Sequence, residues 1–294
     1  MPAFSSLLRE ILCQNGLESY ATPEILAKFT LLTEELLAFN AKTNLTAITE
    51  PQEIAVKHYA DSLLLAARIP EGAKLLDVGC GGGFPCLPIG IVRPDLSITA
   101  LDSTAKKLDF VAQAAKKLEI PHFSTLCGRA ETFAAVKNGH SQGKGGKGAE
   151  KSGSKKKQGK QFSTESGKVV ENVVSSVCNP QETAKIEGNG RYREQFDVVC
   201  ARAVARLPVL CELCLPFLRV GGEMLAMKGA EGLTEHAEAS HAISILGAKT
   251  KKIEEIFLFG LPEAQKRVVI FLQKTAHTPS EYPRDFAKIQ KKPL

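Results

Sequence analysis

The stretch LLDVGCGGGFPCLPIG, from Leu75 to Gly90, decides the fold. Four of its glycines lie within five residues, between two apolar runs. Glycine loses more backbone freedom on folding than any other residue, so such a cluster is typical of a loop that must bend sharply or approach a ligand. A strand before this loop and a helix after it predict a cofactor-binding crevice in an α/β sheet.

The glycine spacing distinguishes between two cofactor classes. The dinucleotide fingerprint G-x-G-x-x-G places its third glycine where this chain has Phe84, counting from Gly79, or Cys86, counting from Gly81. The spacing D-x-G-x-G-x-G over residues 77–83 is instead typical of class I methyltransferases that use S-adenosylmethionine (SAM). We therefore expect SAM to bind, with an NAD-linked oxidoreductase as the less favoured alternative.

Asp102 supports the same interpretation. It ends the next apolar run, LSITALD, nineteen residues after Gly83. A carboxylate at that position can accept hydrogen bonds from both ribose hydroxyls of a nucleoside cofactor.

Strand-like and helix-like segments alternate from residue 74 onward, which predicts right-handed βαβ units and a mostly parallel sheet. The last two strand patterns, at 251–260 and 266–274, are spaced as an antiparallel hairpin. We expect an α/β, Rossmann-like sheet of seven strands with an antiparallel last strand. The expected domains are an N-terminal helical extension (1–70), a methyltransferase domain (71–136 and 191–275), an insertion (137–190) and a C-terminal tail (276–294).

The insertion carries most of the positive charge. Residues 137–190 contain ten lysines and five glutamates, a net charge of +5, whereas the whole chain has +6. This Lys/Gly/Ser-rich stretch has too few apolar residues to offset its ordering entropy, so we expect it to be disordered. It is either a neutral loop expansion or a polybasic arm that raises nonspecific RNA affinity.

The remaining composition indicates an ordinary cytoplasmic protein. No apolar run approaches the roughly 20 residues needed to cross a bilayer, and the N-terminus has the pattern of an amphipathic helix. Cys211 and Cys214 form a C-x-x-C within a helix-period apolar run, without a second pair or a suitably spaced histidine. We interpret them as buried apolar residues and expect no metal site.

Longer motifs resemble one family, the RsmG (GidB) type of 16S ribosomal RNA guanine-N7 methyltransferases. The resemblance covers nearly the whole chain except the insertion. Its motifs are NLTAIT (44–49), VKHYADSL (56–63), DVGCGGGFPCLPIGIVRP (77–94), LDS with KK (101–107), GRAE (128–131), FDVVCARAVA (196–205), MKG (227–229), YPR (282–284) and the final KKPL. The tail departs from the family pattern, with Ala287 and Ile289 where a glycine and a proline are expected.

The resemblance implies roles for individual residues. It implies that eight residues bind SAM: Gly79, Gly81, Gly83, Phe84, Asp102, Ala130, Glu131 and Arg202. Arg202 and Lys228 are the candidates for positioning the substrate, and Arg284, Lys291 and Lys292 for contacting the RNA backbone. Each has a structural alternative: Glu131 as a solvated first-turn residue, for example, or Arg202 as part of an ion pair. His58 and Asp61 are expected to hold the N-terminal helices against the sheet.

The implied reaction requires no general base, because guanine N7 is an unprotonated lone pair. Catalysis would then come from holding N7 and the methyl group in line. The implied substrate is 16S rRNA or the small ribosomal subunit, and we expect a monomer. Two further alternatives are a methyltransferase of another RNA and an RNA-binding protein that keeps the fold without the activity.

Overall fold

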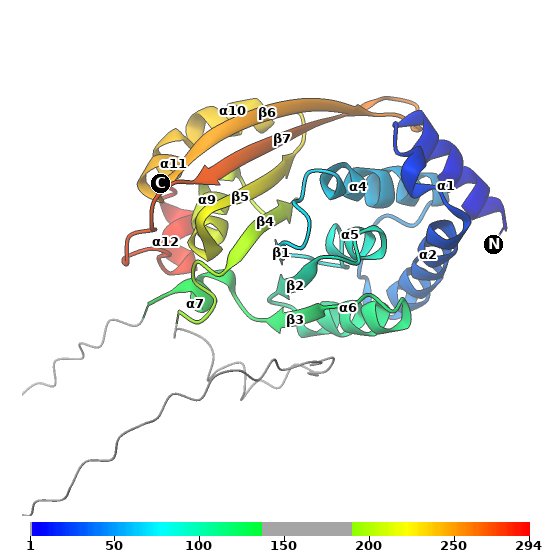
Figure 1. The fold of residues 1–294 in the computed structure, drawn as a ribbon, viewed down its shortest axis with the longest axis horizontal. Helices are drawn as coiled ribbons and strands as arrows, with labels where there is room; N and C mark the ends of the chain where they lie inside the picture. The colour runs from blue at the N-terminus through cyan, green and yellow to red at the C-terminus, as the bar shows by residue number, and fades with distance from the viewer. Residues whose placement is uncertain (1, 137–189) are drawn as a thin grey trace, which may run out of the picture.

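The structure, a computed structural model, describes residues 2–136 and 190–294. Its sheet has the strand order β3-β2-β1-β4-β5-β7-β6 (Figure 1). The strands are β1 (Lys74–Val78), β2 (Ser97–Asp102), β3 (Phe123–Cys127), β4 (Phe196–Arg202), β5 (Leu218–Lys228), β6 (Ala248–Leu258) and β7 (Gln265–Lys274). Strands β1 to β5 pair in parallel, and β7 is antiparallel to both β5 and β6. The expected seven-stranded sheet with its antiparallel last strand is confirmed.

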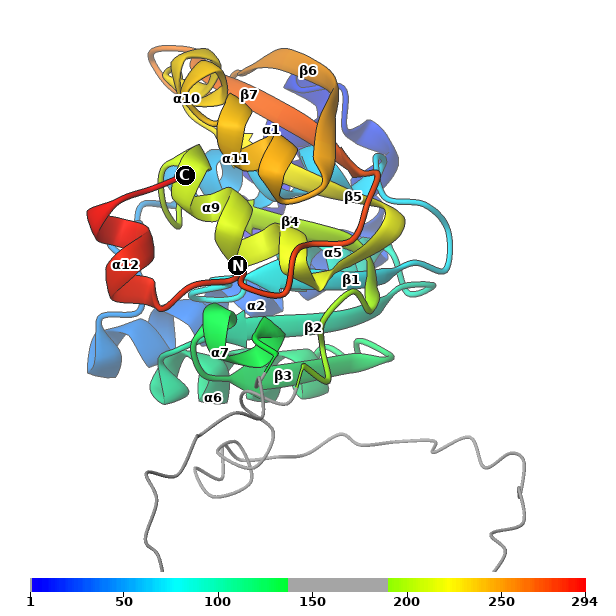
Figure 2. The ribbon, with the colours of Figure 1, turned by 90° about the vertical axis from the view of Figure 1, so that its left-hand side faces the viewer.

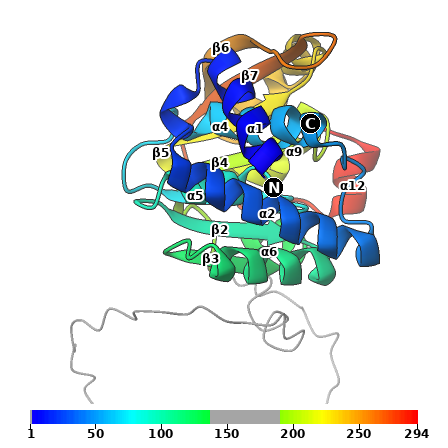
Figure 3. The ribbon, with the colours of Figure 1, turned by 90° about the vertical axis from the view of Figure 1, so that its right-hand side faces the viewer.

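Helices cover both faces of the sheet. One face carries α1 (Pro2–Gln14), α2 (Pro23–Thr43), α4 (Asp61–Ala66), α5 (Cys86–Val92) and α6 (Ala105–Lys117) (Figure 3). The other carries α7 (Ala130–Ala134), α9 (Leu207–Cys214), α10 (Gly232–Glu238), α11 (Ser240–Ile245) and α12 (Phe286–Lys291) (Figure 2). Buried apolar residues form two clusters, one on each side of the sheet. The result is the three-layer arrangement of a doubly wound fold.

The N-terminal helices share the core of the sheet. Thr22 caps α2, because its hydroxyl accepts the backbone N–H of Ile25 at 3.3 Å, and Pro23 occupies the first turn. Leu26 and Phe29 are fully buried in the same cluster as Leu75 of β1. These helices therefore pack on the sheet.

The segment before β1 is helical but not uniform: the chain forms α3 (Pro51–Glu53), the π-helix η2 (Ile54–Ala60) and α4. A π-helix is wider than an α-helix and is frequent at functional sites. Two short helices, α10 and α11, connect β5 to β6. The short segments η1 (Glu18–Tyr20) and η3 (Leu215–Phe217) complete the fold.

Residues 137–189, nearly all of the expected insertion, lie outside the described residues. The chain on either side of them is close in space. A methyl group placed on Gly190 would lie 3.8 Å from the carbonyl oxygen of Ala135. The chain therefore leaves the fold and re-enters it at one place, at the end of α7.

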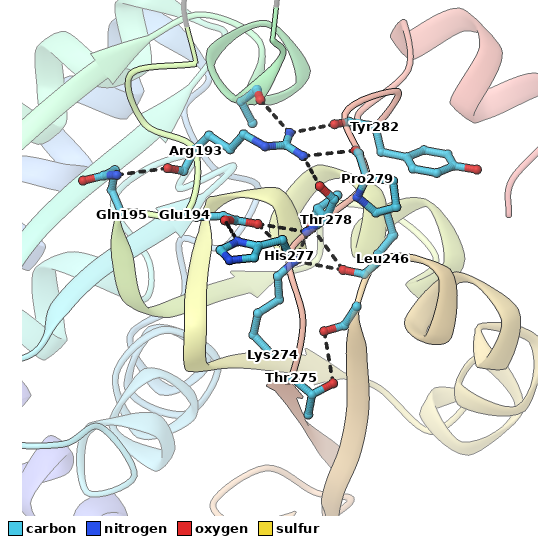
Figure 4. A network of polar contacts seen from close by, with 12 residues as sticks. Arg193, Glu194, Gln195, Leu246, Lys274, Thr275, His277, Thr278, Pro279 and Tyr282 are labelled. Carbon is cyan, nitrogen blue, oxygen red and sulfur yellow. Dashed lines mark hydrogen bonds and ion pairs between the residues drawn. The ribbon is translucent and has the colours of Figure 1, made fainter.

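The C-terminal tail is fixed to the same region (Figure 4). The guanidinium of Arg193 donates to four backbone carbonyls, those of Ala134 in α7 and of Thr278, Pro279 and Tyr282 in the tail. The fully buried Lys274 at the end of β7 donates to the Leu246 carbonyl at 2.8 Å and to the Thr278 hydroxyl. Burial lowers the pKa of Lys274 to about 8. From these anchors the tail crosses one face of the molecule to α12 (Figure 2).

Candidate cofactor site

The glycine loop is held by the neighbouring strand. The backbone N–H groups of Gly79 and Cys80 both donate to the carbonyl of Leu101 in β2, at 2.8 and 3.0 Å. The Gly81 N–H donates to Oδ2 of Asp102 at 3.0 Å, while Oδ1 accepts the Thr104 N–H at 2.8 Å. Asp102 therefore orders the loop. Because each carboxylate oxygen has two lone pairs, it keeps acceptor capacity toward a ligand.

The glycines serve different purposes. All three alternate glycines have positive φ: +73° at Gly79, +57° at Gly81 and +86° at Gly83. A Cβ on Gly79 would lie 2.7 Å from Cγ2 of Val204, and one on Gly83 would lie 2.4 Å from Cδ1 of Leu87. A Cβ on Gly81 would meet no protein atom within 4 Å. Close packing thus requires glycine at 79 and 83, whereas position 81 faces open space.

That open space is a cavity of about 520 Å³, within the usual range for small-molecule sites. It lies at the carboxyl ends of β1 and β4, where the strand order reverses. Seven of the expected cofactor residues line it: Gly79, Gly81, Phe84, Asp102, Ala130, Glu131 and Arg202. Gly83 does not line it, because its missing side chain makes room for α5 and not for a ligand. The open glycine loop and its carboxylate fit a nucleoside cofactor.

Other lining residues escaped the sequence analysis. Lys107, Arg129 and Phe286 also face this cavity. Lys107 lies in the LDSTAKK motif and Arg129 in GRAE, so the motifs could have indicated both. Phe286 comes from the tail, 184 positions beyond Asp102, and carries no local signal.

His58 and Phe84 form the wall nearest the N-terminal helices. Their rings are stacked, with centroids 4.1 Å apart and planes 9° apart. The His58 imidazole, supplied by η2, is buried, and burial together with the positive Arg202 lowers its pKa to about 3. It is therefore a neutral ring at physiological pH. His58 packs the N-terminal helices onto the glycine loop, as expected, and also faces the cavity.

Asp61 joins two arginines from different strands. The buried carboxylate accepts a hydrogen bond from Arg202 at 2.9 Å and another from Arg267 at 2.7 Å. Arg202 also donates to the backbone carbonyl of Lys57 and lies over the Phe84 ring, 5.8 Å from its centroid. Arg202 therefore takes part in an ion pair and also lines the 520 Å³ cavity.

A second cavity of about 410 Å³ adjoins the first, and Arg202 and Ala203 line both. Ala203 has a φ of +55°, a strained conformation for a residue with a side chain. Lys228 also lines the second cavity, where its ammonium pairs with Glu235 at 2.7 Å. The structure thus brings both candidate positioning residues, Arg202 and Lys228, to one place.

The tail residues expected at the RNA backbone separate into two groups. Arg284 forms a bidentate pair with the fully buried Glu212 and thereby anchors the tail, while its contact with the RNA backbone stays a prediction. Lys291 and Lys292 are exposed at the end of α12. Ile289, where the family has a proline, is fully buried and anchors this helix.

Cys211 and Cys214 are fully buried in α9. In the described part of the chain no group of three or more His, Cys, Asp or Glu residues is arranged to hold a metal ion. Among the same residues no helix is both long and apolar enough to cross a membrane.

Comparisons with known proteins identify the family. The family model of rRNA small subunit methyltransferase G matches residues 25–141 and 171–258. Ribosomal RNA small subunit methyltransferase G of Desulfitobacterium hafniense is 36% identical over 91% of this chain and 88% of its own length. The protein of that name from Streptococcus pneumoniae is 33% identical over 91% and 90%.

Among solved structures, an O-methyltransferase from Bacillus cereus in complex with SAH is similar with a TM-score of 0.45 and 14% identity, covering 83% of this chain and 91% of that one. The family model and the curated relatives span most of the chain. The chain therefore belongs to the rRNA small subunit methyltransferase G family.

Proposed function

We propose that this protein transfers a methyl group from SAM to N7 of a guanine in 16S ribosomal RNA. The observation that carries the proposal is a pair of adjoining cavities at the carboxyl edge of the sheet. One contains the glycine loop and Asp102, and the other is lined by cationic side chains. Membership of the methyltransferase family supports the reaction type and the cofactor.

The first cavity would hold SAM. Gly81 leaves room for the cofactor along the loop, and Phe84 provides an apolar wall on which His58 stacks. The remaining acceptor capacity of Asp102 suits the two ribose hydroxyls. Ala130 and Glu131, just beyond β3, would then border the adenine. When bound, SAM supplies an electrophilic methyl group on its sulfonium.

The second cavity would receive the target guanine. Its charged lining consists of four cations and two acids: Lys57, Arg202, Lys228, Arg267, Asp61 and Glu235. This positive excess suits a nucleotide with its phosphate. A base inside a folded RNA has to leave its stack to enter such a cavity. Arg202 and Ala203, shared by both cavities, mark where base and methyl group would meet.

The chemistry requires little from the protein beyond positioning. Guanine N7 has a free lone pair, so no proton has to be removed before it attacks the methyl carbon in line. The imidazole of His58, with a pKa of about 3, is suited to packing and not to proton transfer. Rate enhancement would come from near-attack geometry imposed by the two cavities.

The test is methyl transfer from labelled SAM to small ribosomal subunits that lack the modification, with the nucleosides then resolved by mass. We expect N7-methylguanosine in 16S rRNA. Arg202→Ala should lower kcat at least tenfold, while Arg9→Ala, an exposed arginine of α1, should leave it unchanged. Label in another nucleoside would overturn the substrate, and absence of transfer would favour an RNA-binding protein without activity.

The cofactor can be tested separately. SAM should raise the melting temperature and NAD should not. A rise with NAD alone would restore the oxidoreductase alternative. A monomeric state and a cytoplasmic location belong to the same proposal.

A further inference from the structure

We propose that the C-terminal tail completes the cofactor site. In this inference Phe286 forms the wall over the adenine end of the cavity, and the Arg284–Glu212 pair is the positioning device that holds Phe286 there. The inference rests on the cofactor site proposed above and adds to it Phe286, which lies 81 positions beyond Ala205, the end of the last motif that contributes to that site.

Phe286 is the first residue of α12 and is partly buried against the cluster that contains α9. It lines the first cavity together with Arg129 and Ala130, which follow β3. The guanidinium carbon of Arg129 lies 5.4 Å from the centroid of the Phe286 ring. The aromatic ring and the guanidinium thus form one surface at the β3 side of the cavity.

The strand order assigns this surface to the adenine. With the ribose at Asp102, at the end of β2, the base extends away from β1 and toward β3, which pairs with β2 on its outer side. Aromatic rings and guanidinium planes are the groups on which bases commonly stack. Phe286 and Arg129 provide both at the place where the base would lie.

The contacts of Arg284 with Glu212 hold the tail beside the cavity. Arg284 donates its backbone N–H to Oε1 of Glu212 at 2.7 Å, its Nε to the same oxygen at 2.9 Å, and a terminal nitrogen to Oε2 at 2.6 Å. The Glu212 side chain has no exposed surface. The next residue of α9, Leu213, lines the cavity itself. The anchor therefore connects the tail directly to the cavity wall.

A buried ion pair is weak support for stability alone, because apolar side chains of similar size often stabilise as much. What a bidentate pair provides is a fixed geometry. Here it fixes the backbone two residues before Phe286. Upstream, the contacts of Arg193 hold residues 278–282 against α7 (Figure 4). The tail is thus anchored on both its upstream and its cavity-facing sides.

The test is calorimetric titration with S-adenosylhomocysteine and, separately, with adenosine. Phe286→Ala should weaken both by roughly tenfold, since loss of a base–aromatic contact acts on the nucleoside part of either ligand. Phe286→Tyr should restore most of the affinity. Lys288→Ala, an exposed change on the same helix, should have no effect. Unchanged affinity in Phe286→Ala would overturn the inference.

The positioning role of Arg284 has its own readout. Arg284→Lys keeps the positive charge but loses the two guanidinium donors that bind the Glu212 carboxylate together. The chain should therefore remain folded, while Phe286 is no longer held against the cavity. We expect a severalfold loss of affinity in the wild-type background and no further loss in Phe286→Ala, because the two changes act through one contact. Additive losses would show that Arg284 acts elsewhere and would overturn its role.

Asp102→Asn separates this inference from the proposed cofactor site. If Asp102→Asn binds S-adenosylhomocysteine as well as the wild type, the cofactor site itself is wrong and the tail inference falls with it. If Asp102→Asn binds weakly but Phe286→Ala binds normally, the cofactor site stands and only the tail inference is overturned.

Discussion

Alanine substitutions at Gly81 and Gly83 should separate the cofactor site from the fold. At both positions φ is positive, so alanine must adopt a left-handed conformation that costs about 1–2 kcal/mol. At Gly83 the new methyl group would also lie 2.4 Å from Cδ1 of Leu87, and overpacking of this kind costs about 1–3 kcal/mol more. At Gly81 it would meet no protein atom within 4 Å.

Gly81→Ala should therefore unfold in urea with a free energy about 1–2 kcal/mol below that of the wild type, and Gly83→Ala roughly 2–5 kcal/mol below it. The order reverses for ligand affinity. The methyl group at position 81 occupies cavity space, so we expect S-adenosylhomocysteine to bind at least tenfold more weakly, equivalent to about 1.4 kcal/mol. Gly82→Ala, whose φ is not positive and whose Cβ would lie 3.4 Å from Leu45, is the matched control for stability.

Equal loss of stability in the Gly81 and Gly83 variants would refute the packing argument, because the Leu87 contact would then contribute nothing. Normal ligand affinity in Gly81→Ala would refute the placement of the cofactor against the loop. Either result would require a different explanation for the glycine cluster.

Three further predictions concern charge. Asp61→Asn should leave Arg202 and Arg267 without their shared buried carboxylate, lower the free energy of unfolding by about 3–5 kcal/mol and reduce methyl transfer. Unchanged stability in urea would refute the role of Asp61 in joining the two arginines. His58 has a pKa of about 3 in the folded protein but about 6.5 when unfolded, so between these pH values only the unfolded chain binds the proton. As the pH falls through this range, the free energy of unfolding of the wild type should therefore decrease by up to about 1.4 kcal/mol per pH unit relative to that of His58→Gln; parallel stability curves for the two proteins would contradict the low pKa. Deleting residues 137–189 should preserve S-adenosylhomocysteine binding, because the flanking chain ends adjoin. The deletion removes ten lysines and five glutamates, a net charge of +5, so nonspecific RNA affinity should fall and become less salt-dependent; an unchanged salt dependence would exclude the polybasic arm.

The pattern of the chain was sufficient for the sheet and for the place of the glycine loop. Strand and helix periodicities are local, and the carboxyl ends of parallel strands meet at one edge, so Asp102 could be assigned to the site of the loop. Ala130 and Arg202 were assigned from the resemblance of their motifs to the methyltransferase family. The glycine spacing likewise distinguished the methyltransferase pattern from the dinucleotide one before any contact was known.

Contacts between distant segments could not be foreseen in this way. Whether a glycine makes room for a ligand or for a neighbouring helix depends on which atoms lie opposite, and only the fold places Leu87 against Gly83 and open space against Gly81. Asp61 pairs with Arg202 and Arg267, and Phe286 lines the cavity beside Arg129. These contacts join residues far apart in sequence, so no periodic pattern predicts them. The sequence by itself determined the sheet and the loop, because both follow from local pattern; tertiary structure decided what faces the cavity, because that depends on packing between segments.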